Sequence, residues 1–565
     1  MNPTLIARSE GRRMGRIVTY MSATRRKWAP AALFCGAAVL VAVVVAHGIR
    51  HGEFNLNFDE PHHAFTGLFF ADFFRDLPLR HPVEYAYLYY ARYPVLGVVH
   101  WPPFFYAVEG VFFLLFGPSV ATARTAILLF ALFGLFFWFK LIRELDGDWA
   151  AAASTVVLGL LPFFLLYEKS VMLEIPSLAM CIAAIYFWMR FLRDGMSRHV
   201  YWFAVLAALA LLTKQQSIFL VPLCVLSILA EKKWRLALDR RLWIAVGLVI
   251  VIAGPFYALD FAVHRISINE AVVQGNRAIA HPALYYWSIL PAQLGWPLLA
   301  LALLGVITFR WWARPKSALL MLMWIAACYV AFTPIAIKEP RYILSWVPPF
   351  VYFAIGPWAS KPVWRWRWRR HWLRPVAVAV ITALVVSEAW AGWRYQRPYV
   401  SGYATAASEL VAENKPGIVL YDGDLSANFC FFLRAADPAR RYVLMRKGLY
   451  AVNESKQFGS AELVTTRQGI EQVLARYGIR FIIVDNGPLN FPIQKILRNV
   501  LLTPQFKLIG VFPIKTNVPS LEGRKLFLYE NLRATAPTAK TLRLRMLSLD
   551  HDIVVPLSAL LKQKK

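Results

Sequence analysis

The stretch AALFCGAAVLVAVVVAHGIRHGEFNLNFDEPHH, residues 31–63, decides the fold class of this chain. Its first part, residues 31–47, carries no Asp, Glu, Lys or Arg. It is long enough to cross the hydrocarbon core of a bilayer, which takes about 17–25 residues. Directly after this run, two acids, a proline and two histidines occupy residues 59–63. The stretch therefore predicts a membrane-crossing helix with a polar group at one end.

The rest of the chain has the same apolar character. Of its 565 residues, 58% are hydrophobic and 17% charged, whereas about one quarter of the residues in soluble domains are charged. Candidate spans lie at about residues 31–49, 103–116, 119–140, 150–166, 175–192, 201–213, 216–230, 243–259, 287–308, 317–337, 343–357 and 375–391. We therefore expect an α-helical polytopic membrane protein with about 11–13 transmembrane helices.

The formal net charge of +29 is distributed in short basic bursts between the apolar runs. These bursts lie at residues 7–16, 190–199, 231–241, 310–316 and 361–374. The positive-inside rule predicts this distribution for cytoplasmic loops beside anionic lipid. Because no nucleic-acid recognition module accompanies the charge, we expect membrane lipids and no nucleic acid as partners.

The N-terminal segment and the cysteines further define the class of membrane protein that the sequence predicts. Residues 1–30 form a basic segment that we expect in the cytoplasm, and the run after it lacks a small-residue cleavage site. We therefore expect a first helix rather than a cleaved signal peptide. Of the five cysteines, only Cys430 lies outside the apolar runs, which supports neither a disulfide framework nor a cysteine metal site.

The alternation of basic loops predicts the topology from residue 175 onward. It places Glu174, Lys214, the 260–286 loop and residues 338–342 on the outer side. Between residues 97 and 170 the count fails, because treating every apolar run as a span puts Glu174 on the inner side. Either one run there lies along the membrane interface or a crossing has been missed.

Two regions of the chain are not apolar enough to span. Residues 51–102 contain HHAFTGLFFADFFRDL and EYAYLYYARY, which suit helices at the outer interface, and belong to a transmembrane domain at 31–393. Residues 394–565 have the composition of a soluble domain. There PGIVLYDGD, YGIRFIIVDN and GRKLFLYE predict strands, and ATAASELVAEN and RQGIEQVLAR predict helices. We expect a small C-terminal α/β domain, extracytoplasmic if the last span exits outward.

The pair Asp59-Glu60 is the strongest local signal for chemistry. A transferase needs a carboxylate to accept a proton from an acceptor hydroxyl or to hold a metal beside a phosphate. The alternative is a helix N-cap, because Asp59 precedes Glu60 and Pro61 as a cap precedes the first helical turn. The two roles are compatible, since a cap also holds a carboxylate still.

An acidic pair just after a first transmembrane helix resembles the GT-C glycosyltransferases, which include protein O-mannosyltransferases and lipid A aminoarabinose transferases. Further motifs follow in the order of that family. They are VVHWPPFFYAVEGVFFLLFGPSVATAR (98–124), EKSVMLEIPSLAM (168–180), LALLTKQQSIFL (209–220), HPALYYWSILPAQLGWP (281–297) and KEPRYILSWVPP (338–349). The resemblance covers residues 50–390 and implies a GT-C type of transmembrane catalytic domain.

The resemblance implies transfer of a hexosyl or pentosyl group from a polyprenyl-phosphate carrier to a lipid, polysaccharide or protein hydroxyl. The transfer would take place at the outer face of the cytoplasmic (inner) membrane, by a single inverting displacement. Asp59 would act as general base, Glu60 would shape the acceptor site, and Glu174 would orient the acceptor or a metal. Glu174 is alternatively a plain helix-start acid before Pro176.

The leaving phosphate needs cations, for which Arg341, Lys338 and Lys214 are the candidates. Arg341 suits the role best, because its planar guanidinium donates two hydrogen bonds to a phosphate. Each of the three is alternatively an anchor to lipid headgroups.

A divalent metal ion is a further expectation, with His100 and His281 as its ligands. Some relatives carry an acid and a lysine before the proline, where this chain has His100 and Trp101, so that lysine is absent. A histidine near a membrane edge is alternatively a structural hydrogen-bonding group. We expect His62 and His63 at the interface rather than in the site, since neighbouring side chains on a helix point about 100° apart.

Two other classes of function remain open from the sequence. A lipid or solute transporter or flippase would place ionisable groups near the bilayer midplane and would often contain inverted repeats. In this chain the notable acids lie at the ends of spans, which favours chemistry at the interface. A scaffold without activity would leave Asp59 and Glu174 free to change. The identities of the sugar and of the acceptor are not encoded in any motif.

Overall fold

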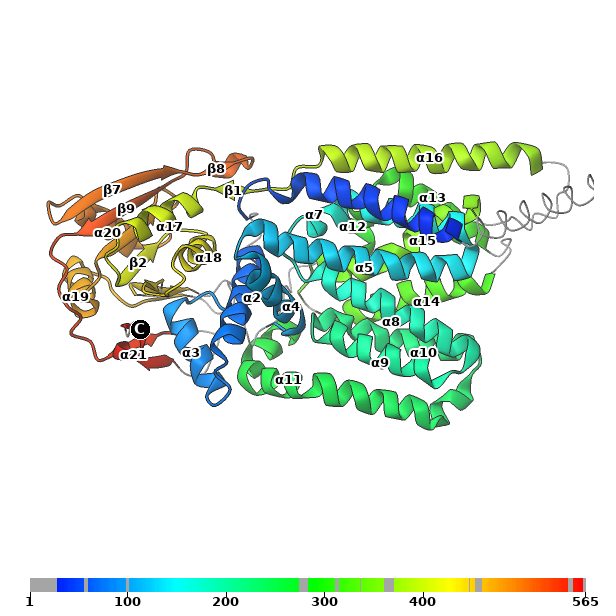
Figure 1. The fold of residues 1–565 in the computed structure, drawn as a ribbon, viewed down its shortest axis with the longest axis horizontal. Coiled ribbons are helices and arrows are strands. Elements are labelled where there is room, and N and C mark those ends of the chain that lie inside the picture. Colours follow the sequence, from blue (N-terminus) through cyan, green and yellow to red (C-terminus); the bar gives the residue numbers. More distant parts are fainter. Residues whose placement is uncertain are drawn as a thin grey trace, which may run out of the picture.

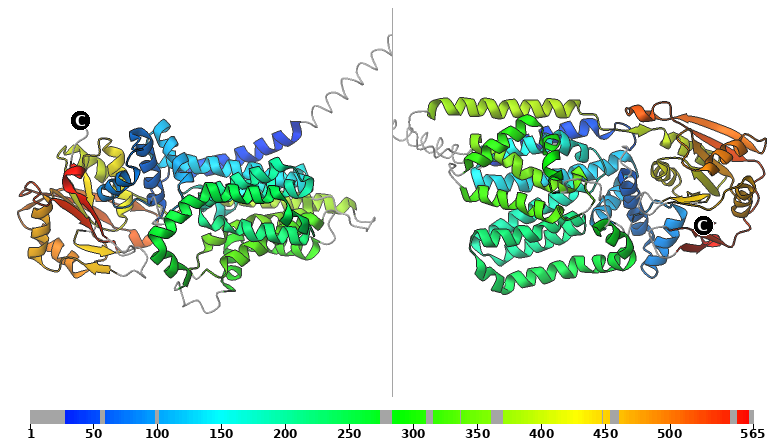
Figure 2. Two further views of the ribbon diagram at one scale, coloured as in Figure 1. Left: turned by 90° about the horizontal axis from the view of Figure 1, so that it is seen from below. Right: turned by 180° about the vertical axis from the view of Figure 1, so that it is seen from behind.

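A computed structural model of the protein describes residues 28–54, 59–97, 101–273, 283–309, 315–335, 337–359, 370–446, 448–452, 460–546 and 552–561. A bundle of helices forms one end of the molecule and a mixed α/β domain the other (Figures 1 and 2). Helices α2, α3 and α4 lie between these two parts (Figure 1).

The bundle is built from the apolar runs of the sequence. Its first helix is Trp28–Ile49. The others are α5 (Val120–Asp146), α6 (Asp148–Leu160), α7 (Pro162–Glu168), α8 (Glu174–Asp194), α9 (Ser197–Leu211), α10 (Leu220–Ala230), α11 (Arg240–Val273), α12 (Tyr285–Leu294), α13 (Trp296–Thr308), α14 (Pro315–Phe332), α15 (Val347–Ala359) and α16 (Arg370–Arg394). Three short 3₁₀ turns join them at η1 (Gln215–Phe219), η2 (Trp234–Leu238) and η4 (Pro340–Trp346).

The bundle is that of a multi-pass membrane protein. Four helices are long and apolar enough to cross a bilayer, and two bent pairs raise the number to six within the described ranges. The pair α6–α7 bends by 66° at Pro162, and α12–α13 bends by 116° at Gly295. Four further apolar helices of 10–17 residues lie within the described ranges, at Phe104–Phe116, Ser197–Leu211, Gln215–Ala230 and Ser317–Phe332.

Helix α4 (Phe104–Phe116) is formed by one of the apolar runs between residues 97 and 170. It packs along α2 at the end of the bundle instead of running parallel to the long helices (Figure 1). Gly110 permits this close approach, since a Cβ there would lie 2.9 Å from the backbone nitrogen of Ala71. Among the described residues of this region, α5 and the bent pair α6–α7 are long and apolar enough to cross a bilayer. Glu174 consequently lies at the same end of the bundle as Asp59.

Helices α2 (Asp59–Asp76) and α3 (Pro82–Arg92) correspond to the two amphipathic stretches of the sequence. Contacts with α4 on one side and with α18 (Ser426–Ala436) on another enclose α2 within the protein. The expectation that His62 and His63 lie at the membrane interface is therefore wrong. Both side chains are buried, because α4 and α18 pack on α2. The local sequence does not reveal this packing.

The C-terminal domain contains a five-stranded mixed sheet in the order β3-β2-β6-β9-β7. Its strands are β2 (Ile418–Asp422), β3 (Val443–Met445), β6 (Phe481–Asp485), β7 (Phe506–Pro513) and β9 (Lys525–Asn531). Strands β3, β2 and β6 are parallel, while β9 pairs antiparallel with both β6 and β7. The three strands predicted from the sequence are confirmed as β2, β6 and β9.

Helices and short ribbons complete the C-terminal domain. The two helices predicted from the sequence are confirmed as α17 (Tyr403–Ala412) and α19 (Arg467–Tyr477). The remaining helical elements are α20 (Pro492–Leu501), η6 (Pro519–Leu521) and α21 (Leu557–Leu561). Antiparallel pairs are formed by β1 (Val400–Ser401) with β8 (Lys515–Thr516), β4 (Tyr450–Val452) with β5 (Ser460–Glu462), and β10 (Thr541–Leu544) with β11 (Ile553–Pro556).

Polar contacts hold the C-terminal domain against the bundle end. Arg434 of α18 forms an ion pair with Asp72 of α2, at 2.8 Å between Nε and Oδ2, and both side chains are buried. The carboxylate of Glu53, after the first helix, accepts hydrogen bonds from the first backbone N–H groups of α17, those of residues 402–404. An acid at a helix N-terminus satisfies donors that have no partner within the helix.

Substituting Gly305→Ala is expected to destabilise the bundle. A Cβ at Gly305 would lie 2.0 Å from the carbonyl oxygen of Phe353, on the neighbouring helix α15. Overpacking of this kind costs about 1–3 kcal/mol. We expect a lower midpoint of thermal unfolding in detergent. Gly247→Ala is the matched control, because no atom lies within 4 Å of its added Cβ. An equal midpoint for both variants would contradict the close packing of α13 on α15.

Candidate active site

A cluster of charged side chains from four elements lies where the bundle meets α2. Arg341 of η4 is at its centre, with Nη1 2.5 Å from Oδ2 of Asp59, the first residue of α2. Its Nε is 2.5 Å from Oε2 of Glu339 and 3.8 Å from Oε1 of Glu174, the first residue of α8. Lys214, just before η1, lies 2.5 Å from the same Glu174 oxygen. Residues far apart in sequence thus form one site.

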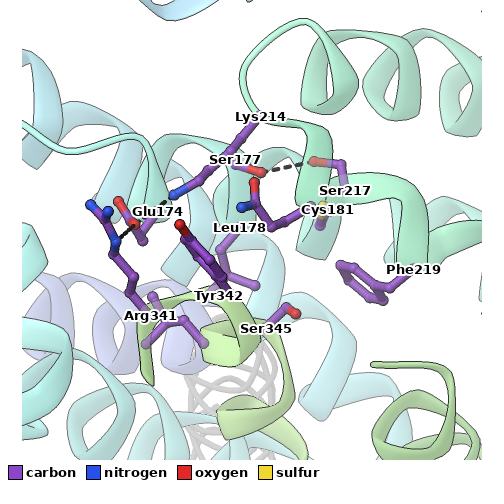
Figure 3. A pocket seen from close by; sticks show the side chains of 12 residues that line it. Glu174, Ser177, Leu178, Cys181, Lys214, Ser217, Phe219, Arg341, Tyr342 and Ser345 are labelled. Carbon is purple, nitrogen blue, oxygen red and sulfur yellow. Dashed lines mark hydrogen bonds and ion pairs between the residues drawn. The ribbon is translucent and has the colours of Figure 1, made fainter. Parts of the chain in front are cut away.

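Two acids of the cluster, Asp59 and Glu174, differ in their exposure to solvent. The side chain of Asp59 is 23% exposed, whereas that of Glu174 is 2% exposed. The second oxygen of Glu174, Oε2, is buried and accepts no hydrogen bond among the residues that the structure describes. In Figure 3, Arg341 and Lys214 approach Glu174 from two sides, with Tyr342 beside them. Asp59 is therefore the accessible carboxylate, and Glu174 is the anchored one.

A narrow cleft leads from this cluster into the bundle (Figure 3). Beyond the charged residues its lining becomes apolar or carries only hydroxyl, thiol and amide groups. These residues are Ser177, Leu178, Cys181, Gln216, Ser217, Phe219, Tyr342, Leu344 and Ser345. The hydroxyls of Ser177 and Ser217 lie 2.8 Å apart and share a hydrogen bond. The cleft therefore has a charged mouth and a largely uncharged interior.

Charges fix the protonation states at the mouth of the cleft. Burial alone would raise the pKa of Asp59, but the charge and hydrogen bond of Arg341, together with the nearby His63 and His62, outweigh burial, so that pKa is lowered and the carboxylate is ionised at neutral pH. For Arg341, burial opposes the charge, while Glu174, Asp59 and Glu339 raise the pKa well above its usual range. Burial lowers the pKa of Lys214 despite the nearby Glu174.

A neutral histidine lies one helical turn from Asp59. His63 is four residues further along α2, so both side chains project from the same face of the helix. Its Nδ1 lies 2.6 Å from the hydroxyl oxygen of Tyr106 on α4. Burial lowers the pKa of His63 to about 3, which keeps the imidazole uncharged. His63 of α2 and Tyr106 of α4 thus form a hydrogen-bonded pair one helical turn from Asp59.

Glu60 points away from this cluster and into the protein. Its side chain is completely buried, with Oε1 3.2 Å from both Nε and Nη2 of Arg124 on α5. Oε1 also accepts a hydrogen bond from the backbone nitrogen of Val171 at 3.0 Å, and Oε2 lies 3.5 Å from Nη1 of Arg397. The structure thus places Glu60 between two arginines rather than beside the cleft.

Of the remaining residues predicted from the sequence, the structure describes Lys338, whose hydrogen bonds lie outside the cluster. Lys338 donates hydrogen bonds to the carbonyl oxygens of residues 332, 333 and 335, at the C-terminal end of α14. An ammonium group is a favourable partner for such a helix end. His100 and His281 lie outside the described residues. Within the described residues, no group of three or more His, Cys, Asp or Glu side chains is arranged to hold a metal ion.

Three residues of the site were not predicted from the sequence. Glu339 and Tyr342 flank the Pro340-Arg341 pair within a motif from which Lys338 and Arg341 were chosen as candidate phosphate ligands. Tyr106 follows the Pro-Pro pair at the start of α4, and its hydroxyl becomes relevant only when α4 packs on α2. An acid next to a proposed phosphate-binding arginine was a usable signal for Glu339, since such pairs hold the guanidinium in place.

Comparisons with known proteins agree with this architecture. The sequence model of the family described as dolichyl-phosphate-mannose-protein mannosyltransferase matches residues 100–258. ArnT from Cupriavidus metallidurans, bound to undecaprenyl phosphate, is similar in structure with a TM-score of 0.59 and 17% identity. That similarity covers 88% of this chain and 99% of ArnT. The chain has the GT-C fold. No curated protein sequence matches it significantly.

The apo state of the same ArnT gives a TM-score of 0.60 at 16% identity, covering 91% of this chain and 100% of ArnT. The GT-C similarity therefore extends over the helical bundle and the C-terminal domain together. The predicted fold class, a GT-C type of helical membrane bundle followed by a domain with strands, is confirmed.

The two neighbouring acids are expected to respond differently to loss of charge. Glu60→Gln leaves Arg124 and Arg397 buried without their carboxylate, and breaking a buried ion pair costs about 3–5 kcal/mol. Asp59→Asn breaks a partly exposed pair and should cost less than about 1 kcal/mol. The measurement is the midpoint of thermal unfolding of both purified variants. Equal losses of stability would contradict the assignment of Glu60 to the framework.

Proposed function

We propose that the protein is an integral-membrane glycosyltransferase. It transfers a sugar from a polyprenyl-phosphate carrier to a hydroxyl group of a cell-envelope acceptor, at the outer face of the cytoplasmic membrane. The observation that carries the proposal is the contact between Asp59 and Arg341, an arginine that also lines the cleft in the bundle. It combines a carboxylate that can accept a proton with a guanidinium that can bind a phosphate.

Asp59 is the general base in this proposal. Its lowered pKa keeps the carboxylate ionised, and its partial exposure gives an acceptor hydroxyl access to it. The acceptor oxygen attacks the anomeric carbon while its proton passes to Asp59. The bond between that carbon and the phosphate oxygen breaks, and polyprenyl phosphate leaves. The displacement inverts the anomeric centre.

Arg341 interacts electrostatically with both the general base and the leaving phosphate of this reaction. The donor phosphodiester carries one negative charge, and the leaving phosphate monoester gains a second as the bond breaks. Asp59 loses its negative charge in the same step, because it takes up the proton. The attraction of Arg341 for Asp59 therefore weakens as its attraction for the phosphate grows. Charge that increases in the transition state is the charge whose stabilisation accelerates a reaction.

Glu174 and Lys214 support this arrangement. Lys214 neutralises Glu174 at 2.5 Å, and the orphan Oε2 of Glu174 remains as an acceptor for a hydroxyl of the substrate. A cation and an ion-paired acid beside the cleft suit a sugar phosphate, which presents one anionic group and several hydroxyls. A divalent metal held by His100 and His281 stays a prediction from the resemblance.

One observation favours a lipid transporter as the second candidate. The pairs α6–α7 and α12–α13 are broken helices, and transporters use such breaks to build binding sites. The charged cluster, however, is formed at the first residues of α2 and α8, and α2 lies at the end of the bundle (Figure 1). This position suits a reaction at the membrane surface better than passage through the membrane.

Asp59→Asn is expected to abolish sugar transfer. Loss of a general base lowers the rate by about 10²–10⁴-fold. The measurement is transfer from labelled polyprenyl-phosphate sugars in proteoliposomes that contain envelope lipids. Glu84→Gln is the matched control, because Glu84 is 69% exposed on α3 and should keep full activity. Near-full turnover by Asp59→Asn would refute the base assignment. Lipid translocation without transfer by the wild-type protein would favour the transporter.

Exposed residues at the two ends of the molecule test its orientation. Leu502 is 79% exposed in the C-terminal domain, and Trp149 is 74% exposed in the first turn of α6, at the opposite end of the bundle. In a Cys35→Ser background, Leu502→Cys should react with a membrane-impermeant thiol reagent in intact spheroplasts. Trp149→Cys should react only after lysis. The reverse pattern would overturn the outer-face proposal.

A further inference from the structure

A second cavity lies on the other side of the first turn of α2. It has a volume of about 420 Å³ and is enclosed by the end of the first helix, the segment before α8 and the residues that follow α16. Three cationic side chains line it, those of Lys169, Arg394 and Arg397. Among the described residues, no Asp or Glu lines this cavity. Its lining therefore favours an anion.

Arg397 has a hydrogen-bonding donor that the protein leaves unused. Its side chain is 2% exposed, and its two terminal nitrogens contact Glu60 and the carbonyl oxygen of His51. Its Nε is buried and has no hydrogen-bond partner among the described residues. Leaving a buried donor unpaired costs about 1–3 kcal/mol, and more for a charged group. The guanidinium of Arg397 thus lies at the cavity without a full set of protein partners.

Lys169 adds donors that are already held in position. Its Nζ donates one hydrogen bond, at 3.1 Å, to the carbonyl oxygen of Gly392 near the end of α16. An ammonium group carries three N–H donors, so two more remain for an acceptor. The side chain is 1% exposed, and a Cβ on Gly48 would lie 3.0 Å from it. Packing against Gly48 therefore directs the ammonium group.

Aromatic residues place the cavity at the level of lipid headgroups. Trp390 and Trp393 are 58% and 44% exposed near the end of α16. Tryptophan concentrates where the hydrocarbon of a bilayer meets its headgroups. Arg394 lies over the ring of Trp390, with its guanidinium carbon 4.2 Å from the ring centroid, and the ring of His47 stacks on Trp393 at 4.0 Å. The cations therefore occur at the depth of phosphate groups.

We propose that this cavity binds the phosphate group of an anionic membrane lipid. The site is separate from the cluster around Asp59 and Arg341. It combines three cations, an unpaired buried donor and an aromatic rim at headgroup depth. Arg397 contacts both the cavity and Glu60, so the bound lipid would reinforce the first turn of α2 from behind. Binding does not depend on turnover, and its test needs none.

The experiment measures lipid binding to the purified full chain by native mass spectrometry. The probes are short-chain phosphatidylglycerol, short-chain phosphatidylcholine and inorganic phosphate. The variants are Arg394→Gln and Lys169→Gln, and thermal unfolding verifies that each is folded. Arg80→Gln is the matched control, because Arg80 is an exposed arginine between α2 and α3. We expect at least tenfold weaker phosphatidylglycerol binding in both cavity variants and no change in the control.

Competition with inorganic phosphate identifies the source of the phosphate group that the cavity binds. Competition by inorganic phosphate would show that the cavity recognises phosphate itself, and lack of competition would show that it requires the lipid. Either result supports the proposal when binding depends on Arg394. The proposal is overturned if both cavity variants bind phosphatidylglycerol like the wild type. Equal binding of phosphatidylcholine and phosphatidylglycerol by every variant would also overturn it.

Discussion

The buried carboxylate of Glu60 is the interaction on which the site depends. It joins Arg124 of α5 with Arg397 from the segment after α16, and it accepts a hydrogen bond from the backbone before α8. Arg124 in turn donates to the carbonyl oxygen of Ile49 at 2.8 Å, where the first helix ends. Four distant segments thus meet at one carboxylate. Buried ions require such complete pairing, because each desolvated charge is costly when it stands alone.

This framework explains why neighbouring acids have different roles. Adjacent residues on a helix project about 100° apart, so a first turn that buries Glu60 directs Asp59 toward the opposite side. There Arg341 meets Asp59, while Arg397 lies behind with Glu60. The catalytic carboxylate of the proposed reaction is therefore held by a neighbour that takes no part in it. Small shifts of a reacting group lower rates strongly, which makes such anchoring useful.

The sequence predicted what depends on local pattern or on the order of motifs. Hydrophobic runs indicated the bundle, and short apolar runs next to amphipathic helices indicated β2 and β6. The acid pair and Arg341 were predicted as site residues. The contact between Asp59 and Arg341 was not predictable, because the two residues lie 282 positions apart. The placement of α4 was not predictable either, because it depends on packing against α2 through Gly110. Lys338 was predicted to bind phosphate, but in the structure its ammonium group donates to three carbonyl oxygens at the end of α14.

Two carboxylates side by side should repel each other, and the fold offsets this repulsion in two ways. Both lie in the first turn of α2, where the helix dipole favours negative charge. Each also has its own guanidinium partner, and those partners approach from different sides. Protonation of Asp59 during a reaction would remove one of the two negative charges and relieve the remaining repulsion. The buried pair on Glu60 would lose nothing in that step, so the framework stays intact while the charge on Asp59 changes.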